Sequence, residues 1–247
     1  MVHISKKPLK DEQLMMEHTE RVLCVRIVGM GNMRPKLVMV TGIDGSGKTT
    51  IAKLLVKQLR LRQYRVSYVW IKSLHSIIYV IYHFFKNITK EKLILNPNRI
   101  IISRFEPSDY NDLSKLWLFL EFVSVLPWVL LKVYLPIFLG FVVVADRYVI
   151  DTIVTLSIRV KKLYFVNSFI GRLLLRMIPE ETIIIHLDVG LDIVLRRRYN
   201  IEYTLREIEN QIMLYRKLAK RVGAYNIDTA KLSIEETLGL VLDKLAV

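Results

Sequence analysis

The sequence predicts an α/β fold, in which a parallel sheet carries helices on both of its faces. Two observations lead to this prediction. Short apolar runs alternate along the chain with longer segments whose apolar residues recur at helical spacing, which is typical of a parallel sheet with crossover helices. A glycine-rich loop also lies between the first apolar run and the first helical segment, as in the strand–loop–helix unit that holds phosphate groups.

Strands are predicted where apolar residues follow one another without alternation, because a strand covered on both faces has no polar side. The predicted strands cover residues 37–41, 66–71, 141–145, 182–187 and 222–227. Helical spacing predicts helices over residues 51–61, 74–85, 112–139, 191–198 and 204–221, two more between 150 and 177, and a last one from 233. Residues 87–110 show no clear pattern.

Two of the predicted helices begin with a capping box, in which a serine or threonine and a glutamate three residues later satisfy each other's backbone N–H groups. The pairs are Thr204 with Glu207 and Ser233 with Glu236. They support the predicted starts of the last two helices.

The longest apolar stretch, residues 116–145, raises the question of a membrane span. Its only charges are Glu121 and Lys132, and Pro127 and Pro136 divide it. A charge at the centre of a bilayer costs a few kcal/mol, and proline removes a helical hydrogen bond. We therefore expect buried or interfacial helices, broken near the two prolines, and not a spanning helix.

The composition excludes several classes of protein. One cysteine, Cys24, excludes a disulfide framework and a cysteine-based zinc cluster. A hydrophobic fraction of 52% with a charged fraction of 24% excludes a disordered chain. The net charge of +14 predicts nucleic acid, a membrane surface or a phosphorylated small molecule as partner. No nucleic-acid-binding motif is present, so we expect no nucleic-acid partner.

The N-terminal segment carries charges over residues 1–20 and has no apolar core of the kind found in a secretory signal. Together with the unpaired cysteine, this predicts a cytoplasmic protein, with peripheral membrane contact as a further expectation. Met33 lies just before the first predicted strand, so a compact domain could begin there. We expect residues 1–32 to be an N-terminal extension that is either non-native or disordered.

The loop after the first strand matches the phosphate-binding pattern G-x-x-x-x-G-K-[ST]. Its glycines let backbone N–H groups point at phosphate oxygens, Lys48 supplies charge to the β- and γ-phosphates, and the Thr49 hydroxyl is placed to bind Mg²⁺. The residues predicted to bind ATP here are Gly42, Ile43, Asp44, Gly45, Ser46, Gly47, Lys48, Thr49 and Thr50.

A second polar group, Asp146 with Arg147, follows the strand predicted over residues 141–145. Ligands of open α/β sheets bind at the carboxyl ends of the strands. We predict that Asp146 holds Mg²⁺ or its waters and that Arg147 clamps a phosphate with two hydrogen bonds. The alternative is an aspartate at a helix N-terminus beside a surface arginine.

Three consecutive arginines, Arg196, Arg197 and Arg198, follow a strand and a short helix. They cannot all face one way, so one or two of them are predicted to neutralise a transferring phosphoryl group. The alternative is a solvated face, which is the usual role of a charge run. A solvated face is also what we predict for the four cations of the first helix, Lys53, Lys57, Arg60 and Arg62.

Asp44 lies inside the phosphate loop, where a carboxylate is electrostatically unfavourable. We predict that it accepts a hydroxyl of the acceptor or orients a basic group. A turn-stabilising role, with its side chain bonded to nearby amides, is the alternative.

These motifs resemble the thymidylate kinase family of P-loop nucleoside monophosphate kinases. The resemblance covers residues 36–245 and lies in the phosphate loop and in Asp146-Arg147-Tyr148, with support from residues 187–189 and 227–229. It implies a P-loop NTPase fold with a five-stranded parallel sheet, and residues 33–247 as one P-loop kinase domain. It also implies transfer of the γ-phosphate of ATP to dTMP with Mg²⁺, and a homodimer.

The resemblance further implies roles for individual residues. Family members carry an arginine in the phosphate loop or supply one from a lid, and Gly45 at the loop position implies a lid arginine from residues 196–198. Asp228 would lie near adenine. The catalytic set so implied is Lys48, Arg147, Arg196, Arg197 and Arg198, and the acceptor set is Asp44, Phe122, Asp146, Arg147 and Asp151.

The sequence departs from the family on the acceptor side. Leu126 stands four residues after Phe122, where the family has the arginine that reads thymine, and residues 70–73 replace the family's Arg-Glu-Pro-Gly-Gly. Hydrogen-bonding readers of this kind provide most discrimination between substrates. Two alternatives to a dTMP kinase therefore stand beside it: a related kinase with an apolar or membrane-borne acceptor, and a nucleotide-binding switch without kinase activity.

Overall fold

The computed structural model describes residues 35–71, 111–197 and 203–245, with side chains in the second range from residue 118 onward. The expected extension over residues 1–32, the helix predicted over residues 74–85 and Arg198 lie outside the described residues.

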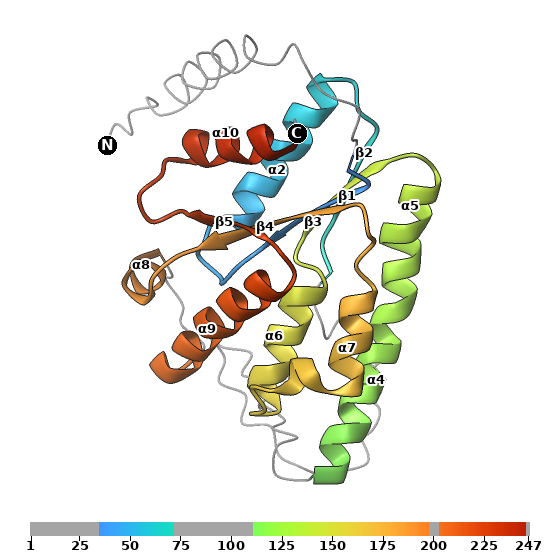
Figure 1. The fold of residues 1–247 in the computed structure, drawn as a ribbon, viewed down its shortest axis with the longest axis vertical. Coiled ribbons are helices and arrows are strands. Elements are labelled where there is room, and N and C mark those ends of the chain that lie inside the picture. Colours follow the sequence, from blue (N-terminus) through green and yellow to red (C-terminus); the bar gives the residue numbers. More distant parts are fainter. Residues whose placement is uncertain (1–34, 72–110, 198–202, 246–247) are drawn as a thin grey trace, which may run out of the picture.

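A single parallel sheet forms the centre of the described chain (Figure 1). Its five strands lie in the order β2-β3-β1-β4-β5, so the α/β prediction and the five-stranded sheet are confirmed. The strands are β1 (Leu37–Thr41), β2 (Val66–Val69), β3 (Val142–Asp146), β4 (Thr182–Asp188) and β5 (Tyr225–Asp228).

The central strand β1 shows why these runs form a sheet interior. All five of its residues are buried, as are all five of β3, because helices cover both faces. The register pairs Val40 with Asp146 and Thr41 with His186. The carboxyl ends of β1, β3 and β4 therefore meet at one edge of the sheet, where their following loops come together.

Each face of the sheet is covered by its own set of helices (Figure 1). The first set is α2 (Lys48–Leu61) and α10 (Ile234–Leu245), whose buried residues pack with those of β1 that share the face of Val38 and Val40. The second set packs on the face of Leu37 and Met39 and comprises α4 (Asn111–Val129), α6 (Val149–Arg159), α7 (Phe169–Arg176) and α9 (Leu205–Arg221). A short helix, α8 (Leu191–Arg197), follows β4.

The predicted boundaries hold closely, with two informative shifts. The helix α2 begins three residues earlier than predicted, because Lys48 and the two threonines after it already form its first turn. The strand β5 begins three residues later than predicted, because Val222 caps α9 and Gly223 turns the chain with a φ of 67°. Both predicted capping boxes form.

The prediction that the helix over residues 112–139 breaks at its prolines is wrong. Helix α4 contains Pro127 and continues through a π-helical turn, η2 (Leu130–Tyr134), into α5 (Leu135–Phe138). In this wider turn, which lies between the two prolines, the Leu135 amide donates to the Leu130 carbonyl five residues back. Pro136 lies in the first turn of α5.

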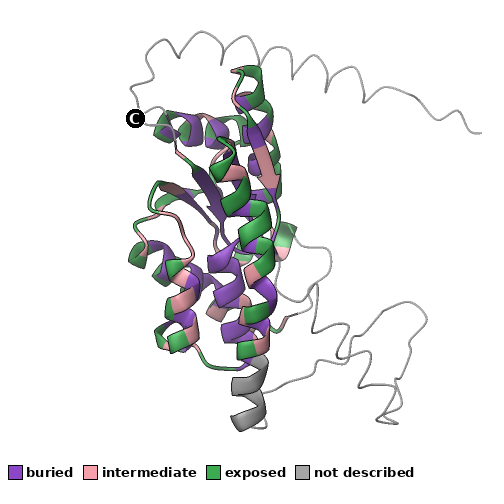
Figure 2. Ribbon diagram, turned by 90° about the vertical axis from the view of Figure 1, so that its right-hand side faces the viewer, coloured by how far each residue is buried: buried purple, intermediate pink, exposed green. Residues whose placement is uncertain are grey.

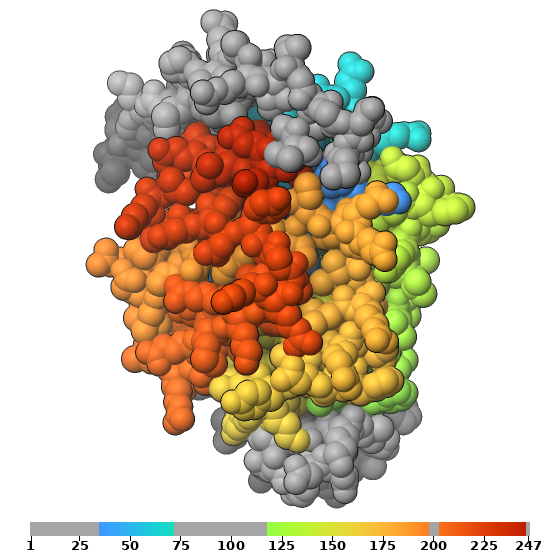
Figure 3. All heavy atoms as spheres, viewed as in Figure 1, coloured from blue at the N-terminus to red at the C-terminus, as the bar shows by residue number. Residues whose placement is uncertain are grey.

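The continuous helix α4–α5 packs into the core along one side and is exposed along the other. Among the described residues, one helix is long and apolar enough to cross a membrane by length and composition, and it covers Leu118–Phe138. About a third of its most apolar part is buried inside the protein. Val125, Val129 and Val133 recur every four residues and pack into the core, which agrees with the predicted buried or interfacial helix. Its outward side is exposed in Figure 2, and the helix forms one long edge of the molecule in Figure 3.

Candidate functional site

The phosphate loop has the backbone shape that its glycines predict. Gly42, Gly45 and Gly47 have φ values of 148°, 93° and 92°, which L-residues rarely adopt. A Cβ on Gly42 would lie 2.4 Å from the carbonyl oxygen of Leu187 on β4, so only glycine fits there. Gly47 is the N-cap of α2, so the loop ends at a helix N-terminus, the part of a helix that attracts anions.

Lys48 lies beneath this loop with only 4% of its surface exposed. Its Nζ donates to the Ile43 carbonyl at 2.8 Å and pairs with the Asp44 carboxylate at 3.4 Å. Burial lowers the pKa of Lys48, while the carboxylates of Asp151 and Asp44 oppose that shift. The ammonium is therefore held in place by loop oxygens, and a phosphate oxygen could replace them.

Arg147 joins β3 to the phosphate loop. Its backbone has a φ of 73°, an uncommon conformation for a residue other than glycine, and its guanidinium donates to the Asp44 carboxylate. Burial by itself lowers the pKa of Arg147, but Asp44 and Asp151 outweigh burial and raise it, so the guanidinium stays charged. Backbone strain of this kind is concentrated at functional sites.

Asp146, at the end of β3, is fully buried. Its Oδ2 accepts a hydrogen bond from the Tyr68 hydroxyl at 2.8 Å, and its Oδ1 has no hydrogen-bond partner among the described residues. An unpaired buried carboxylate oxygen at this edge suits a cation or a water bound to one.

The donor set fits Mg²⁺ better than a transition metal. Thr49 lies exposed in the first turn of α2, next in sequence to Lys48. Among the described residues there is no group of three histidine, cysteine or acidic side chains able to hold a metal. Mg²⁺ is typically held by one or two protein oxygens with substrate phosphates and water, which Thr49 and Asp146 could supply.

Asp151, in the first turn of α6, is buried behind these groups. Its Oδ2 accepts the Thr41 hydroxyl at 3.0 Å and its Oδ1 accepts the Tyr215 hydroxyl at 2.9 Å. Burial raises the pKa of Asp151, while Lys48 and Arg147 oppose that shift. Because both carboxylate oxygens of Asp151 already accept protein hydroxyls, Asp151 could contact an acceptor substrate only if one of these two hydrogen bonds were replaced.

Of the three consecutive arginines, Arg197 contacts the phosphate loop. It donates to the Gly45 carbonyl at 3.4 Å and to the Thr229 carbonyl at 2.9 Å. Arg196 is exposed at the end of α8, and Arg198 lies outside the described residues. The α8 arginine run thus places one side chain, that of Arg197, against the phosphate loop, and its predicted role in neutralising a phosphoryl group stays a prediction.

The loop after β5 lies against the phosphate loop as well. The Thr229 hydroxyl donates to the Ser46 carbonyl at 3.2 Å, which ties the two loops together. The Ser46 hydroxyl oxygen is buried without a hydrogen-bond partner among the described residues. Asp228 is exposed and accepts the Ala230 amide at 2.9 Å, so it shapes this loop, and its contact with adenine remains a prediction.

Phe122 is a predicted site residue that no described contact brings to the loops. It is half-buried on α4 and packs against the core cluster on that face of the sheet. Its role in stacking on a base therefore remains a prediction.

Sequence reasoning missed several residues that support the site, namely Tyr68, Thr41, Tyr215 and Thr229. The sequence pattern could have indicated Thr41 and Thr229. Thr41 is a hydroxyl residue at the carboxyl end of a predicted strand, and Thr229 lies two residues after the end of another. Tyr68 and Tyr215 act across 78 and 64 residues of sequence, and no local pattern signals such contacts.

Comparisons with known proteins support the fold. No protein-family model matches the chain, and no curated protein matches it. Among solved structures, a thymidylate kinase from Ehrlichia chaffeensis is similar with a TM-score of 0.50 and 16% identity, over 85% of this chain and 97% of that one. The YorR protein from Bacillus subtilis, solved in complex with phosphorylated GDP, has a TM-score of 0.45 and 17% identity, over 85% and 95%. The chain therefore has the α/β fold of P-loop kinases.

Proposed function

We propose that the chain is an ATP- and Mg²⁺-dependent phosphotransferase that phosphorylates a nucleoside monophosphate, with conversion of dTMP to dTDP as the first reaction to test. The observation that carries this proposal is the convergence of three cations on one phosphate loop. Lys48 lies beneath the loop, Arg147 holds its carboxylate, and Arg197 donates to its Gly45 carbonyl.

The three cations come from separate elements, which suits stabilisation of a transferring phosphoryl group. Lys48 belongs to α2, Arg147 follows β3, and Arg197 ends α8. During phosphoryl transfer, negative charge is spread over the three outer oxygens of the phosphoryl group, and fixed cations around them lower the barrier. A site for binding phosphate alone needs fewer such groups.

The state of the carboxylates favours a phosphate as the acceptor. A hydroxyl acceptor needs a base to take its proton, but Asp44 pairs with Arg147 and both oxygens of Asp151 accept protein hydroxyls. A monophosphate has a second pKa near 6, so its attacking oxygen is already ionised at neutral pH. The new P–O bond then forms at that oxygen while the bond from the γ-phosphorus to the β–γ bridging oxygen breaks, and ADP leaves.

Mg²⁺ would be held by Thr49 and Asp146, where it supplies positive charge to the β- and γ-phosphate oxygens. The Tyr68 hydroxyl fixes one oxygen of Asp146 and leaves the other directed to this task. Asp44 is proposed to contact the sugar of the acceptor, and Phe122 its base.

A second candidate is a related kinase with an apolar or membrane-borne acceptor. The observation in its favour is the exposed apolar side of α4–α5, where Phe138 is 86%, Leu131 60% and Leu130 58% exposed. Leu126 on the same helix cannot form hydrogen bonds to a base. A third candidate, a nucleotide-binding switch, would use the same loop without an acceptor.

The proposal extends to organisation of the protein. Residues 33–247 form the kinase domain, and residues 1–32 are an extension that a chain beginning at Met33 can lack. The exposed side of α4–α5 would be covered by a second copy in a homodimer, and the protein would act in the cytoplasm. Sedimentation of the full chain and flotation with vesicles separate a dimer face from a membrane contact.

The experiment that tests the activity is product analysis with a panel of acceptors. ATP and Mg²⁺ are incubated with dTMP, dUMP, the other monophosphates and a lipid extract, and nucleotides and lipids are separated. Formation of a nucleoside diphosphate supports the first candidate, and phosphorylated lipid supports the second. ATP binding without transfer to any acceptor would support the switch.

A further inference from the structure

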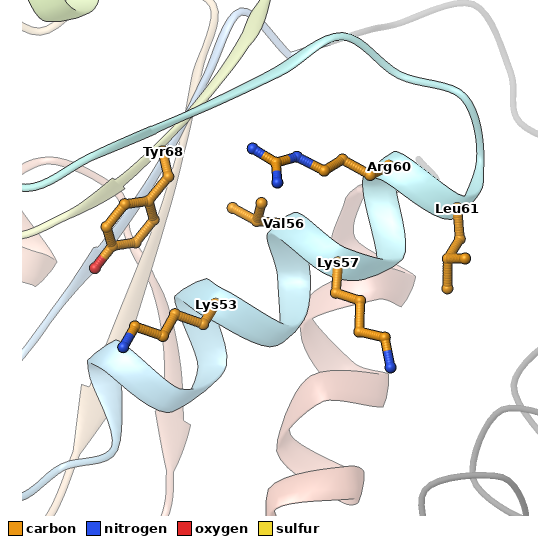
Figure 4. Close-up of a pocket in the computed structure, with 6 residues that line it drawn as sticks. All are labelled: Lys53, Val56, Lys57, Arg60, Leu61 and Tyr68. Carbon is orange, nitrogen blue, oxygen red and sulfur yellow. The ribbon is translucent and has the colours of Figure 1, made fainter.

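A groove lies beside α2, away from the phosphate loop (Figure 4). It has a volume of about 490 Å³, within the range of about 300–1,000 Å³ that is usual for small-molecule sites. The residues that line it are Lys53, Val56, Lys57, Arg60, Leu61 and Tyr68.

The groove is basic. Three of the six described residues that line it are cations from one helix, at positions 53, 57 and 60, and none of these six is acidic. Seven residues of helix span about 10 Å, so the cations could meet anionic groups along the length of a small molecule. The sequence-based prediction of a plain solvated face for these cations misses the groove.

The wall opposite the helix is a fixed aromatic ring. Tyr68 projects from β2 toward the side of α2 that carries Lys53 and Arg60, whereas Lys57 points away from it (Figure 4). The Tyr68 hydroxyl is bonded to the Asp146 carboxylate at 2.8 Å, which holds the ring in place. Because the ring is already fixed in the free protein, stacking of a flat group on it costs little side-chain entropy.

The groove and the base-binding part of the proposed acceptor region pack on opposite faces of the sheet. Val56 and Tyr68 pack with the core cluster on the α2 face of the sheet. Phe122 and the residues after Arg147, beginning with Tyr148, pack with the cluster on the opposite face. The sheet therefore lies between the apolar lining of the groove and Phe122, while the Tyr68 hydroxyl reaches Asp146 at the carboxyl end of β3.

We propose that this groove is a second anion site, which binds a small molecule carrying at least two phosphate groups and a flat portion, of the nucleoside diphosphate type. The phosphates meet Lys53 and Arg60, and the flat portion stacks on Tyr68. Val56 and Leu61 supply the apolar contacts. This site does not depend on phosphotransferase activity.

The test counts binding sites on the full chain by calorimetry with two probes, ADP and inorganic tripolyphosphate. The wild type is expected to bind two ADP molecules. Lys53→Glu with Arg60→Glu is expected to bind one, through the phosphate loop. Lys48→Ala is expected to keep the groove site, with affinity within about threefold. Tripolyphosphate is expected to bind the groove more weakly than ADP, because it lacks a flat portion to stack on Tyr68.

A matched control separates groove binding from general charge. Lys162→Glu with Lys220→Glu makes the same change in net charge at exposed positions on other elements and is expected to bind two ADP molecules. Lys53→Gln with Arg60→Gln serves as a milder version, and circular dichroism checks that each variant folds. If the phosphate loop does not bind nucleotide, the wild type still binds one ADP, which the groove variants lose. Equal binding by groove and control variants would overturn the proposal, as would a single wild-type site lost with Lys48.

Discussion

The guanidinium of Arg147 donates to the carboxylate of Asp44, and this contact joins the end of β3 to the phosphate loop. Arg147 holds a left-handed backbone conformation to make it. Asp44 also pairs with Lys48, so one carboxylate lies between two cations. The prediction that Asp44 orients a basic group thus has a structural counterpart, while its contact with an acceptor stays a proposal.

Asp44→Asn is predicted to change binding and turnover in opposite directions. Removing one negative charge beside the phosphates should tighten ADP binding by roughly 1 kcal/mol, or about fivefold, at low salt. Turnover should fall, because Arg147 loses the group that positions it. Calorimetry at two salt concentrations and steady-state kinetics measure the two effects. Weaker ADP binding together with full turnover would contradict this role.

Arg197→Ala is predicted to reduce kcat on the order of 10³-fold, the lower range for an arginine that stabilises a transferring phosphoryl group. Arg196→Ala, one position away, should have a smaller effect, because both arginines are exposed but it is Arg197 that donates to the Gly45 carbonyl. Kinetics of the two variants side by side identify the lid arginine. A larger loss in Arg196→Ala would assign the role to the other side chain.

Gly42→Ala is predicted to destabilise the protein by about 1–3 kcal/mol, since its Cβ would meet the Leu187 carbonyl oxygen at 2.4 Å. ADP binding should weaken as the loop shifts. Gly239→Ala in α10 is the control, because its Cβ meets no atom within 4 Å and alanine favours a helix by about 1 kcal/mol. Urea unfolding compares the two, and equal stabilities would count against the close approach of β4 to the loop.

Asp151→Asn is predicted to alter the pH dependence of stability. Burial raises the folded-state pKa of Asp151 above its ordinary value of 3.8, so the folded state holds this proton more tightly than the unfolded state. The resulting stabilisation is present below about pH 3.8 and is lost as pH rises through the folded-state pKa. Asparagine does not ionise, so the variant should gain stability relative to wild type over that range.

Urea unfolding of Asp151→Asn and wild type at a series of pH values measures this difference. A difference in unfolding free energy that is constant with pH, or that moves against the variant as pH rises, would show that Asp151 is not the titrating group.

The fold could be predicted from the sequence because its signals are local. Uninterrupted apolar runs mark strands buried on both faces, and the capping boxes at Thr204 and Ser233 mark helix starts. The predicted break of the helix over residues 112–139 is wrong. Proline predicts a break, but the helix continues past Pro127 and through a π-helical turn. Packing of Val129 and Val133 in the core supports that continuity, and a sequence pattern does not show it.

The site could be predicted where its residues follow strands and loops in sequence. The glycine loop, Asp146 and Arg147 lie at strand ends, and parallel strands bring such ends to one edge. The contacts of Tyr68 and Tyr215 could not be predicted, because they depend on which strands and helices are neighbours. The groove beside α2 escaped prediction because a row of helical cations has the same pattern whether or not a strand lies opposite.

The most direct test of the central claim is transfer of labelled phosphate from γ-labelled ATP to dTMP by the wild type and by Lys48→Ala. The proposal predicts labelled dTDP in amounts equal to the ADP formed, and a loss of several orders of magnitude in the variant. Absence of labelled diphosphate with every nucleoside monophosphate, or transfer by Lys48→Ala at the wild-type rate, would contradict it.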